Sequence, residues 1–210
     1  MSDIFKLIAS NAVTGPGNRN RDLLPLLRPE TRGHLVQFYK DDAFLIENVT
    51  HLVEKTLSAG DSSVLVATSS HIGSIEERLT RRGLDLRGLR AEGRYVALDA
   101  NETLSRLMLN DWPNDDRFIQ IIEDVIRRAI EKSATRFVFA FGEMVALLCA
   151  ADKPNAALCL EQLWNSLIKR YCFSLCCGYP LSSLVSESAL DAVLDICVEH
   201  SFTIPAEADF

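Results

Sequence analysis

The residues of this 210-residue chain that could do chemistry gather in four short polar segments. Each segment follows a run of apolar residues, so each lies where a predicted strand ends. The four segments are Thr68-Ser69-Ser70-His71, Asp99-Ala100-Asn101, Gly142-Glu143-Met144 and Gly178-Tyr179-Pro180. Hydroxyl, imidazole, carboxylate and phenol groups at such places could hydrogen-bond a small polar molecule. These segments are therefore the first candidates for a ligand site.

Segment 68–71 occupies the place where a phosphate-binding loop would lie, because backbone N–H groups at the amino end of a helix can hold an anion. The segment lacks the G-x-x-x-x-G-K-[ST] spacing, however, and has no lysine for the β- and γ-phosphates. Competent ATP hydrolysis is therefore not expected. His71 either hydrogen-bonds a ligand or serves as a surface histidine at a helix cap.

Glu143 comes one glycine after the most apolar strand candidate, residues 137–141. An acid at this place could hold a metal-bound water, as in an ATPase, and Gly142 permits a close backbone approach. Alternatively, Glu143 is a first-turn glutamate that the helix dipole favours. Both interpretations stay open on the sequence alone.

Recognised enzyme signatures are absent or incomplete. The sequence contains no G-x-G-x-x-G, G-x-S-x-G or H-E-x-x-H, and the S-x-x-K match at Ser166 to Lys169 lies mid-helix without its partner motifs. The four histidines show no ligand spacing among themselves or with the cysteines. The six cysteines all follow residue 148, within apolar runs and without C-x-x-C, which favours buried small hydrophobic residues. We therefore predict no catalytic residue, no metal site and no cofactor.

The elements that position these residues alternate between two periods. Apolar, β-rich runs at 34–39, 63–68, 95–98, 137–141 and 172–177 predict strands, and amphipathic stretches between them predict helices. Helices are expected from 42 to Gly60, from a capping box at 74–77 to Arg82, from 118 to 132, from 143 to 149, from 154 to 170 and from 186 to 199. Asp41 and Asp42 supply cap chemistry for the first of these helices, and Asp99 to Glu102 repeats the capping spacing. Continuous apolar strands separated by helices predict a doubly wound α/β fold with a mainly parallel sheet and helices on both faces.

Two parts of the chain differ in composition. Residues 1–33 contain a Gly/Pro/Asn-rich stretch and are predicted to be an appendage that is mobile or binds a partner, whereas residues 34–210 form the domain. In a doubly wound sheet, ligands bind beyond the carboxyl ends of the strands at the switch point of strand order. The predicted ligand-binding residues are His34, Tyr39, Asp42, Thr68, His71, Glu143, Trp164 and Tyr179.

Trp164 and Tyr179, like His71 and Glu143, have plain structural alternatives. Glu143 would bind the polar part of the ligand, and Trp164 would pack against its apolar part. A tryptophan on the apolar face of the predicted helix 154–170 equally fits the core. Tyr179 and Pro180 also fit a simple turn at the end of a strand.

Charge and hydropathy limit the partners. Twenty-two basic and 29 acidic residues give a net charge of −7, which argues against direct nucleic-acid binding. An arginine run between Arg78 and Arg94 is offset by nearby acids and is interpreted as a solvated face. No apolar run reaches the roughly 20 residues of a membrane span, and the amino terminus does not resemble a signal peptide. We expect a cytoplasmic protein without membrane attachment.

Five segments stand in the order seen in one known family. His34-Leu-Val-Gln-Phe-Tyr-Lys-Asp-Asp42, the strand and turn 64–68, Phe141-Gly-Glu-Met144, Leu160-Glu-Gln-Leu-Trp-Asn165 and Cys176-Cys-Gly-Tyr-Pro180 resemble the MEDS domains, named for a methanogen/methylotroph, dichloromethane-repressor sensory domain. The resemblance covers about residues 33–206. It implies a RecA/KaiC-like core without a phosphate-binding loop. It also implies sensing of small molecules, including hydrocarbon derivatives, for DNA-binding regulators or histidine kinases.

The leading hypothesis is a non-enzymatic, stand-alone sensory domain. It would bind an unknown small molecule and regulate a histidine kinase or transcription regulator in trans, as a monomer or a homodimer. The first alternative is a degenerate RecA/KaiC-like nucleotide-binding protein or weak NTPase. A second is an interaction scaffold that docks through residues 1–33, and the last is a cysteine-based redox sensor.

Overall fold

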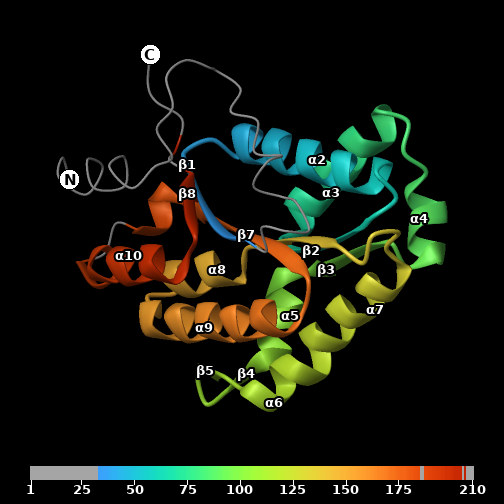
Figure 1. Ribbon diagram of the computed structural model, residues 1–210. Helices are drawn as coiled ribbons and strands as arrows, with labels where there is room; N and C mark the ends of the chain where they lie inside the picture. Colours follow the sequence, from blue (N-terminus) through green and yellow to red (C-terminus); the bar gives the residue numbers. More distant parts are fainter. Residues whose placement is uncertain (1–32, 185–186, 205, 207–210) are drawn as a thin grey trace.

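The computed structural model describes residues 33–184, 187–204 and 206. All but Gly33 of the predicted appendage 1–33 therefore lies outside the described residues. The centre of the domain is a six-stranded, all-parallel sheet in the order β3-β2-β6-β7-β1-β8 (Figure 1). Its strands are β1 (His34–Tyr39), β2 (Ser62–Ala67), β3 (Tyr95–Asp99), β6 (Val138–Gly142), β7 (Phe173–Pro180) and β8 (Phe202–Ile204). This arrangement confirms the predicted α/β fold class.

Helices cover both faces of the sheet (Figure 1). One face carries α2 (Asp42–Ser58), α3 (Ser69–Arg81) and α4 (Leu86–Glu92). The other carries α5 (Ala100–Leu107), α6 (Asp115–Phe118), α7 (Asp124–Lys132), α8 (Met144–Ala150), α9 (Pro154–Arg170) and α10 (Glu187–Glu199). A π-helical segment, Ile119–Glu123, joins α6 to α7, and a 3-10 turn, Leu181–Leu184, follows β7.

The direction in which the chain crosses the sheet determines which face each helix covers. After β1 and β2 the chain moves toward the β3 edge, and after β3 it turns back toward the β8 edge. Because parallel crossovers are right-handed, the two directions place their helices on opposite faces. The central strands β2 and β6 are buried throughout, so each face has its own apolar core. Phe118 and Trp164 belong to one core, and Leu52 and Phe139 to the other.

Four helices start at side-chain caps. The side chains of Asp41, Asp85, Asp99 and Asn114 accept hydrogen bonds from backbone N–H groups in the first turns of α2, α4, α5 and α6. The helix predicted to open at the capping box 74–77 instead begins at Ser69, so this prediction was wrong. The buried residues His71, Ile75 and Leu79 lie at helical spacing and extend the packed face one turn further back.

Several short elements were not predicted. These are α4, strand β8 and a small antiparallel hairpin of β4 (Met108–Leu109) and β5 (Trp112–Pro113). The hairpin turns through Asn110 and Asp111, whose φ values of 50° and 68° lie in the left-handed region. Asn and Asp tolerate this region better than most residues, so the pair suits a tight hairpin turn.

One switch point lies between β2 and β6. These strands are neighbours, yet α3 leaves β2 toward one face and α8 leaves β6 toward the other. The loops after the two strands therefore diverge, and the carboxyl edge between them is the place where doubly wound proteins bind ligands.

Candidate functional site

Glu143 connects the two strands at the switch point. Its side chain is only 4% exposed, and its Oε2 accepts a hydrogen bond of 2.8 Å from the backbone N–H of Thr68, the cap of α3. Its Oε1 lies 2.5 Å from Nδ1 of His71. The backbone N–H of Glu143 donates to the carbonyl of Val66 in β2 over 3.0 Å. One carboxylate thus joins the ends of β6 and β2 to the first turn of α3.

The Glu143 carboxylate shifts the pKa values of His71 and Tyr39. The hydrogen bond with Glu143 raises the pKa of His71, and Asp42, whose Oδ2 lies 3.5 Å from Nε2, acts in the same direction against the effect of burial. Burial raises the pKa of Tyr39 well above its usual value, and the charges of Glu143 and Asp42 add to this. Tyr39 therefore stays a hydroxyl donor. We call Tyr39, Asp42, Thr68, His71 and Glu143 the switch-point cluster.

The rim of this cluster is acidic. Ser69 Oγ donates to Oδ2 of Asp99 at the end of β3, over 2.5 Å. This hydrogen bond and backbone donors, mainly Glu102 N–H, hold the pKa of Asp99 below its usual value. Asp42 is 67% exposed, and the carboxylates of Asp42, Asp99 and Glu143 lie around the first turn of α3. Such a rim disfavours a phosphate and favours a neutral or cationic guest.

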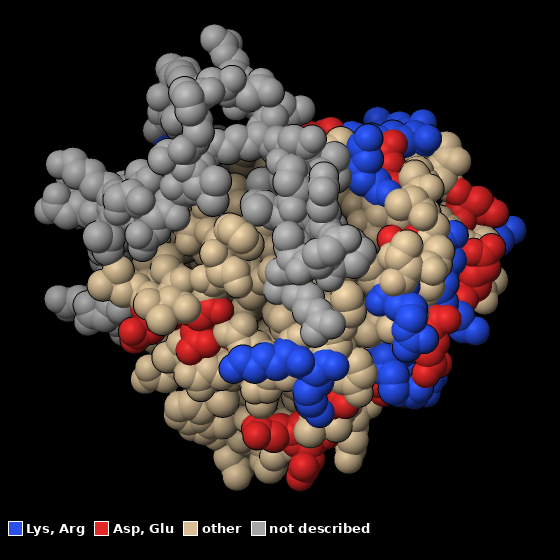
Figure 2. Space-filling model, viewed as in Figure 1, with Lys and Arg blue, Asp and Glu red and all other residues tan. Residues whose placement is uncertain are grey.

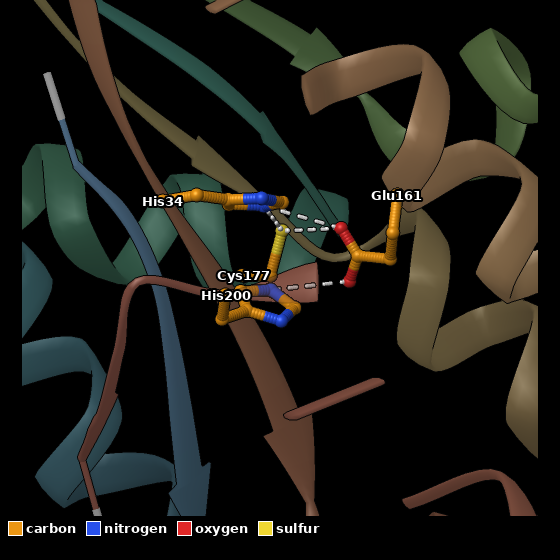
Figure 3. Close-up of side chains that lie close together, drawn as sticks. All are labelled: His34, Glu161, Cys177 and His200. Atoms are coloured by element: carbon orange, nitrogen blue, oxygen red, sulfur yellow. Dashed lines mark hydrogen bonds and ion pairs between the residues drawn. The ribbon is translucent and has the colours of Figure 1, made fainter. Parts of the chain in front are cut away.

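A second polar group lies buried beneath β1 and β7. His34 from the start of β1, Glu161 from α9, Cys177 from β7 and His200 from the turn after α10 point toward one another (Figure 3). The Nε2 of His34 lies 3.2 Å from Oε2 of Glu161 and 3.4 Å from Sγ of Cys177. Sγ of Cys177 is 3.4 Å from the same Oε2, and Nε2 of His200 is 3.4 Å from Oε1. We call these four residues the buried cluster.

Charge in the buried cluster is concentrated on Glu161, whose side chain is fully buried. Burial alone would raise the pKa of this carboxyl, but the positive charge and hydrogen bonds that His200 and His34 supply when protonated lower it below its usual range. Tyr179 donates to its Oε1 over 2.7 Å. Burial, and then the charge of Glu161, raise the pKa of the Cys177 thiol well above its ordinary value. Glu161 is thus a carboxylate, and Cys177 is a thiol unless another positive charge enters.

The eight predicted binding residues separate into three groups. The switch-point cluster contains Tyr39, Asp42, Thr68, His71 and Glu143, and here His71 is largely buried rather than a surface cap. The other two groups lie elsewhere. His34 belongs to the buried cluster and Tyr179 hydrogen-bonds it, whereas Trp164 packs edge-on against Phe118 and Phe173 in the core, with ring centroids 5.1 and 6.3 Å away.

Sequence reasoning did not find Glu161, Cys177 and His200 as neighbours of His34. One signal was available: Glu161 stands on the apolar stripe of α9, next to Leu160 and in line with Trp164. A carboxylate on a core-facing stripe is uncommon unless it has a partner. The partners themselves come from distant parts of the chain, so only the strand order reveals them.

The arginine run is paired with acids. Figure 2 shows basic and acidic side chains interspersed on the side of the molecule that carries α2, α3 and α4. The ion pairs there are Arg78 with Glu47, Arg82 with Glu47 and Glu54, Arg81 with Glu77, Arg90 with Glu76, and Arg94 with Glu92. The shallow hollow lined by Arg78, Arg81 and Arg82 is therefore already neutralised by carboxylates. This agrees with the interpretation of a solvated charged face.

The fold and the switch-point cluster together define an α/β domain with buried polar side chains at the carboxyl edge of its sheet. A family model described as MEDS, the methanogen/methylotroph, DcmR sensory domain, matches residues 33–195. The chain therefore belongs to the MEDS sensory-domain family, which implies a role in sensing a signal. A search of curated proteins found no match. Among the described residues, no helix is both long and apolar enough for a membrane span.

Proposed function

We propose that the protein senses a small, uncharged or cationic molecule at the switch-point cluster and regulates a signalling partner. The observation that carries this proposal is the position of Glu143, a buried carboxylate shared by Thr68 and His71 where helices leave to opposite faces. A guest that donates a hydrogen bond to Glu143 would compete directly with His71 or Thr68.

Such competition would convert binding of the guest into movement of α3. Since Thr68 caps α3 and His71 lies in its first turn, a guest that takes their place on Glu143 frees the amino end of α3 to move. A ligand shifts such an equilibrium only by the difference between its affinities for the two states. The partner would recognise the arrangement of α3 and the neighbouring loops. A histidine kinase or a transcription regulator, acting in trans, is the partner class that the family suggests.

The family description also narrows the guest. It names methylotrophs and methanogens, organisms that live on or produce one-carbon compounds. Methanol and methylamine can each donate a hydrogen bond to a carboxylate, and methylammonium also complements the acidic rim. Dichloromethane offers only weak C–H donors, so it serves as the apolar member of the same series.

The test uses the full chain with methanol, methylammonium chloride and dichloromethane as probes, read out by thermal unfolding and isothermal titration. Native mass spectrometry of freshly purified protein, recorded first, reports any co-purifying molecule and the subunit number. The variant is Glu143→Gln, and the matched control is Glu77→Gln, which changes an exposed glutamate on α3. We expect at least one probe to stabilise the wild type and the control, and binding to weaken roughly tenfold or more in Glu143→Gln.

Equal binding by Glu143→Gln and the wild type would overturn the assignment of the site. The nucleotide alternative is tested in the same assay with ATP and GTP in the presence of Mg²⁺. Stabilisation by a nucleotide, together with turnover that is lost in Glu143→Gln, would replace the proposed sensor with an NTPase. The acidic rim, with the Glu143 carboxylate at the amino end of α3, is the reason we expect neither.

A further inference from the structure

We propose that the buried cluster binds one transition-metal ion of tetrahedral preference, Zn²⁺ in the first instance. The ligand atoms would be Nε2 of His34, Oε2 of Glu161, Sγ of Cys177 and Nε2 of His200. One ligand atom from each of the four residues lies within 4.8 Å of the other three, and all four residues are buried (Figure 3). The site is separate from the switch-point cluster and does not depend on its function.

The tautomers of both histidines are fixed from outside the cluster. Asn165 directs its NH₂ group to the carbonyl and a carboxylate oxygen of Glu199, over 2.8 and 2.7 Å, so its Oδ1 must face Nδ1 of His34, 2.9 Å away. Nδ1 of His34 therefore carries a hydrogen. Nδ1 of His200 lies 2.6 Å from the carbonyl oxygen of Ile196 and must donate too. In each neutral ring, the lone pair then belongs to Nε2, the atom that points into the cluster.

When both rings are neutral, the lone pairs of the two Nε2 atoms converge with the Glu161 carboxylate on one space. The two Nε2 atoms face the Glu161 carboxylate at 3.2 and 3.4 Å. Nε2 of His200 is buried and has no hydrogen-bond partner among the described residues. Protonating both rings would satisfy the carboxylate but would place two imidazolium ions 4.0 Å apart, measured between ring centroids. A single bound cation satisfies all of the lone pairs at once.

The spacing fits a tetrahedral ion. Bonds of about 2.0–2.3 Å from zinc to N, O and S ligands give tetrahedral edges of about 3.3–3.7 Å. His34, Glu161 and Cys177 form a triangle with edges of 3.2, 3.4 and 3.4 Å, and His200 approaches the carboxylate from the other oxygen. Nitrogen, sulfur and carboxylate ligands in this geometry favour zinc over magnesium or calcium.

The charge balance and the hydrogen bonds that hold the ligand side chains also suit a zinc site in which all four ligands come from the protein. Zinc binding replaces the S–H bond of Cys177 with a Zn–S bond and releases the proton to solvent. The charges of thiolate, carboxylate and Zn²⁺ then cancel. Tyr179 holds Glu161, and Asn165 and the Ile196 carbonyl hold the two imidazoles, as outer partners hold ligands in known zinc sites. With four protein ligands, the ion keeps no open position, which favours a structural over a catalytic role.

The experiment titrates the full chain, stripped with a chelator, with Zn²⁺ against a chromophoric competitor, and with Co²⁺ as a spectroscopic probe. We expect one Zn²⁺ to bind per chain. Bound Co²⁺ should show the visible bands of tetrahedral coordination and a near-ultraviolet sulfur-to-cobalt band, and Zn²⁺ should displace it. Failure of the wild type to take up one equivalent, or an octahedral cobalt spectrum without the sulfur band, overturns the proposal.

The matched variants are Cys177→Ala and Cys176→Ala. Both cysteines are buried in β7, but Cys176 belongs to the core on the opposite face of the sheet. We expect Cys177→Ala to lose the sulfur band and about 100-fold or more in zinc affinity, and Cys176→Ala to keep both. His200→Gln, outside the sheet, should weaken zinc binding while keeping the sulfur band. Wild-type affinity in both Cys177→Ala and His200→Gln would show adventitious binding elsewhere and overturn the proposal.

Discussion

Glu143 is the residue on which the switch-point cluster depends. Its carboxylate accepts from the backbone of Thr68 and faces His71, and through His71 it is connected to Asp42 on the first turn of α2. A buried carboxylate needs such partners, because an unpaired charge in the interior is costly. The same partners make Glu143 sensitive to anything that competes for them.

The stability that this pair contributes should depend on pH. Glu143 raises the pKa of His71, so the folded protein holds the proton on His71 more tightly than the unfolded chain does. The contribution is therefore complete below about pH 6.5, the unfolded pKa, and is lost as the pH rises through the folded pKa. We expect Glu143→Gln to cost about 1–3 kcal/mol of unfolding free energy near pH 6, with a smaller cost near pH 9.

Urea unfolding over a series of pH values measures this difference. Asp42 and Tyr39, the other titratable groups of the cluster, are unchanged in the variant. Glu77→Gln should parallel the wild type throughout, since an exposed ion pair contributes little. A cost of Glu143→Gln that grows with rising pH would contradict the assignment of the His71 proton.

Asn165 should act on metal affinity without touching the metal. It orients His34 through Nδ1 and is itself held by Glu199. Its replacement in Asn165→Ala frees the imidazole to rotate and to exchange tautomers. We expect zinc affinity to fall by about 10–100-fold, the usual effect of losing an outer partner. Ser166→Ala is the control, because Ser166 is exposed on α9 and its hydroxyl donates only to the backbone carbonyl of Gln162. An equal loss in both variants would argue against the tautomer mechanism.

At the scale of elements, Asp61 joins two loops at the amino edge of the sheet. It lies between α2 and β2, and its Oδ1 accepts from Ser133 Oγ over 2.7 Å and from the N–H and Oγ1 of Thr135 over 2.9 Å each. Ser133 Oγ in turn accepts from the backbone N–H of Phe137. One buried carboxylate thus fixes where β2 and β6 begin, and so fixes their register.

Removing this carboxylate should destabilise the whole domain. Asp61→Ala leaves three donors without their acceptor in a largely buried place, and we expect a loss of about 2–4 kcal/mol in unfolding free energy. The comparison is Asp85→Ala, which removes the exposed cap of α4 and should cost about 1 kcal/mol. Urea unfolding measures both losses, and a smaller loss for Asp61→Ala than for Asp85→Ala would contradict this account.

The elements were more predictable from sequence than the contacts between them. Long apolar runs such as 137–141 and the amphipathic helix from Pro154 define their own type, and the two capping aspartates at Asp41 and Asp99 mark helix starts. Strand β8 and helix α4 are short, so neither carries enough periodicity to be recognised. The switch-point loops could be predicted because they follow strands, whereas the buried cluster could not, because only the pairing of β1 with β7 brings His34 beside Cys177.

At the scale of the whole molecule, the two clusters act on different parts of the sheet. The switch-point cluster lies where β2 and β6 end, beneath the first turn of α3. The buried cluster lies on the opposite helical layer, among β1, β7, α9 and the turn after α10. Under the mechanism proposed above, α3 would be the part that moves, and the β7–β1–β8 side of the sheet would be the part that stays fixed.

A bound metal ion would cross-link the described chain almost from end to end. His34 opens β1 and His200 precedes β8, and the N–H of Ser201 already donates to the carbonyl of His34 over 2.7 Å. An ion shared by both histidines closes a loop that spans nearly the whole domain, which restricts the unfolded chain and stabilises the folded one. At a free Zn²⁺ concentration 100 times the Kd, the gain should be about 2.7 kcal/mol.

Hydrogen exchange of the metal-stripped chain with and without Zn²⁺ locates this gain. Amides of α10, β8 and β1 should exchange more slowly when Zn²⁺ is added, because their opening then requires the ion to leave. Amides of α3 and α4, which open without disturbing the buried cluster, should keep their rates. His200→Gln should remove the effect. Equal slowing in α3 and β8, or slowing that persists in His200→Gln, would mean that the ion does not join the two ends of the described chain.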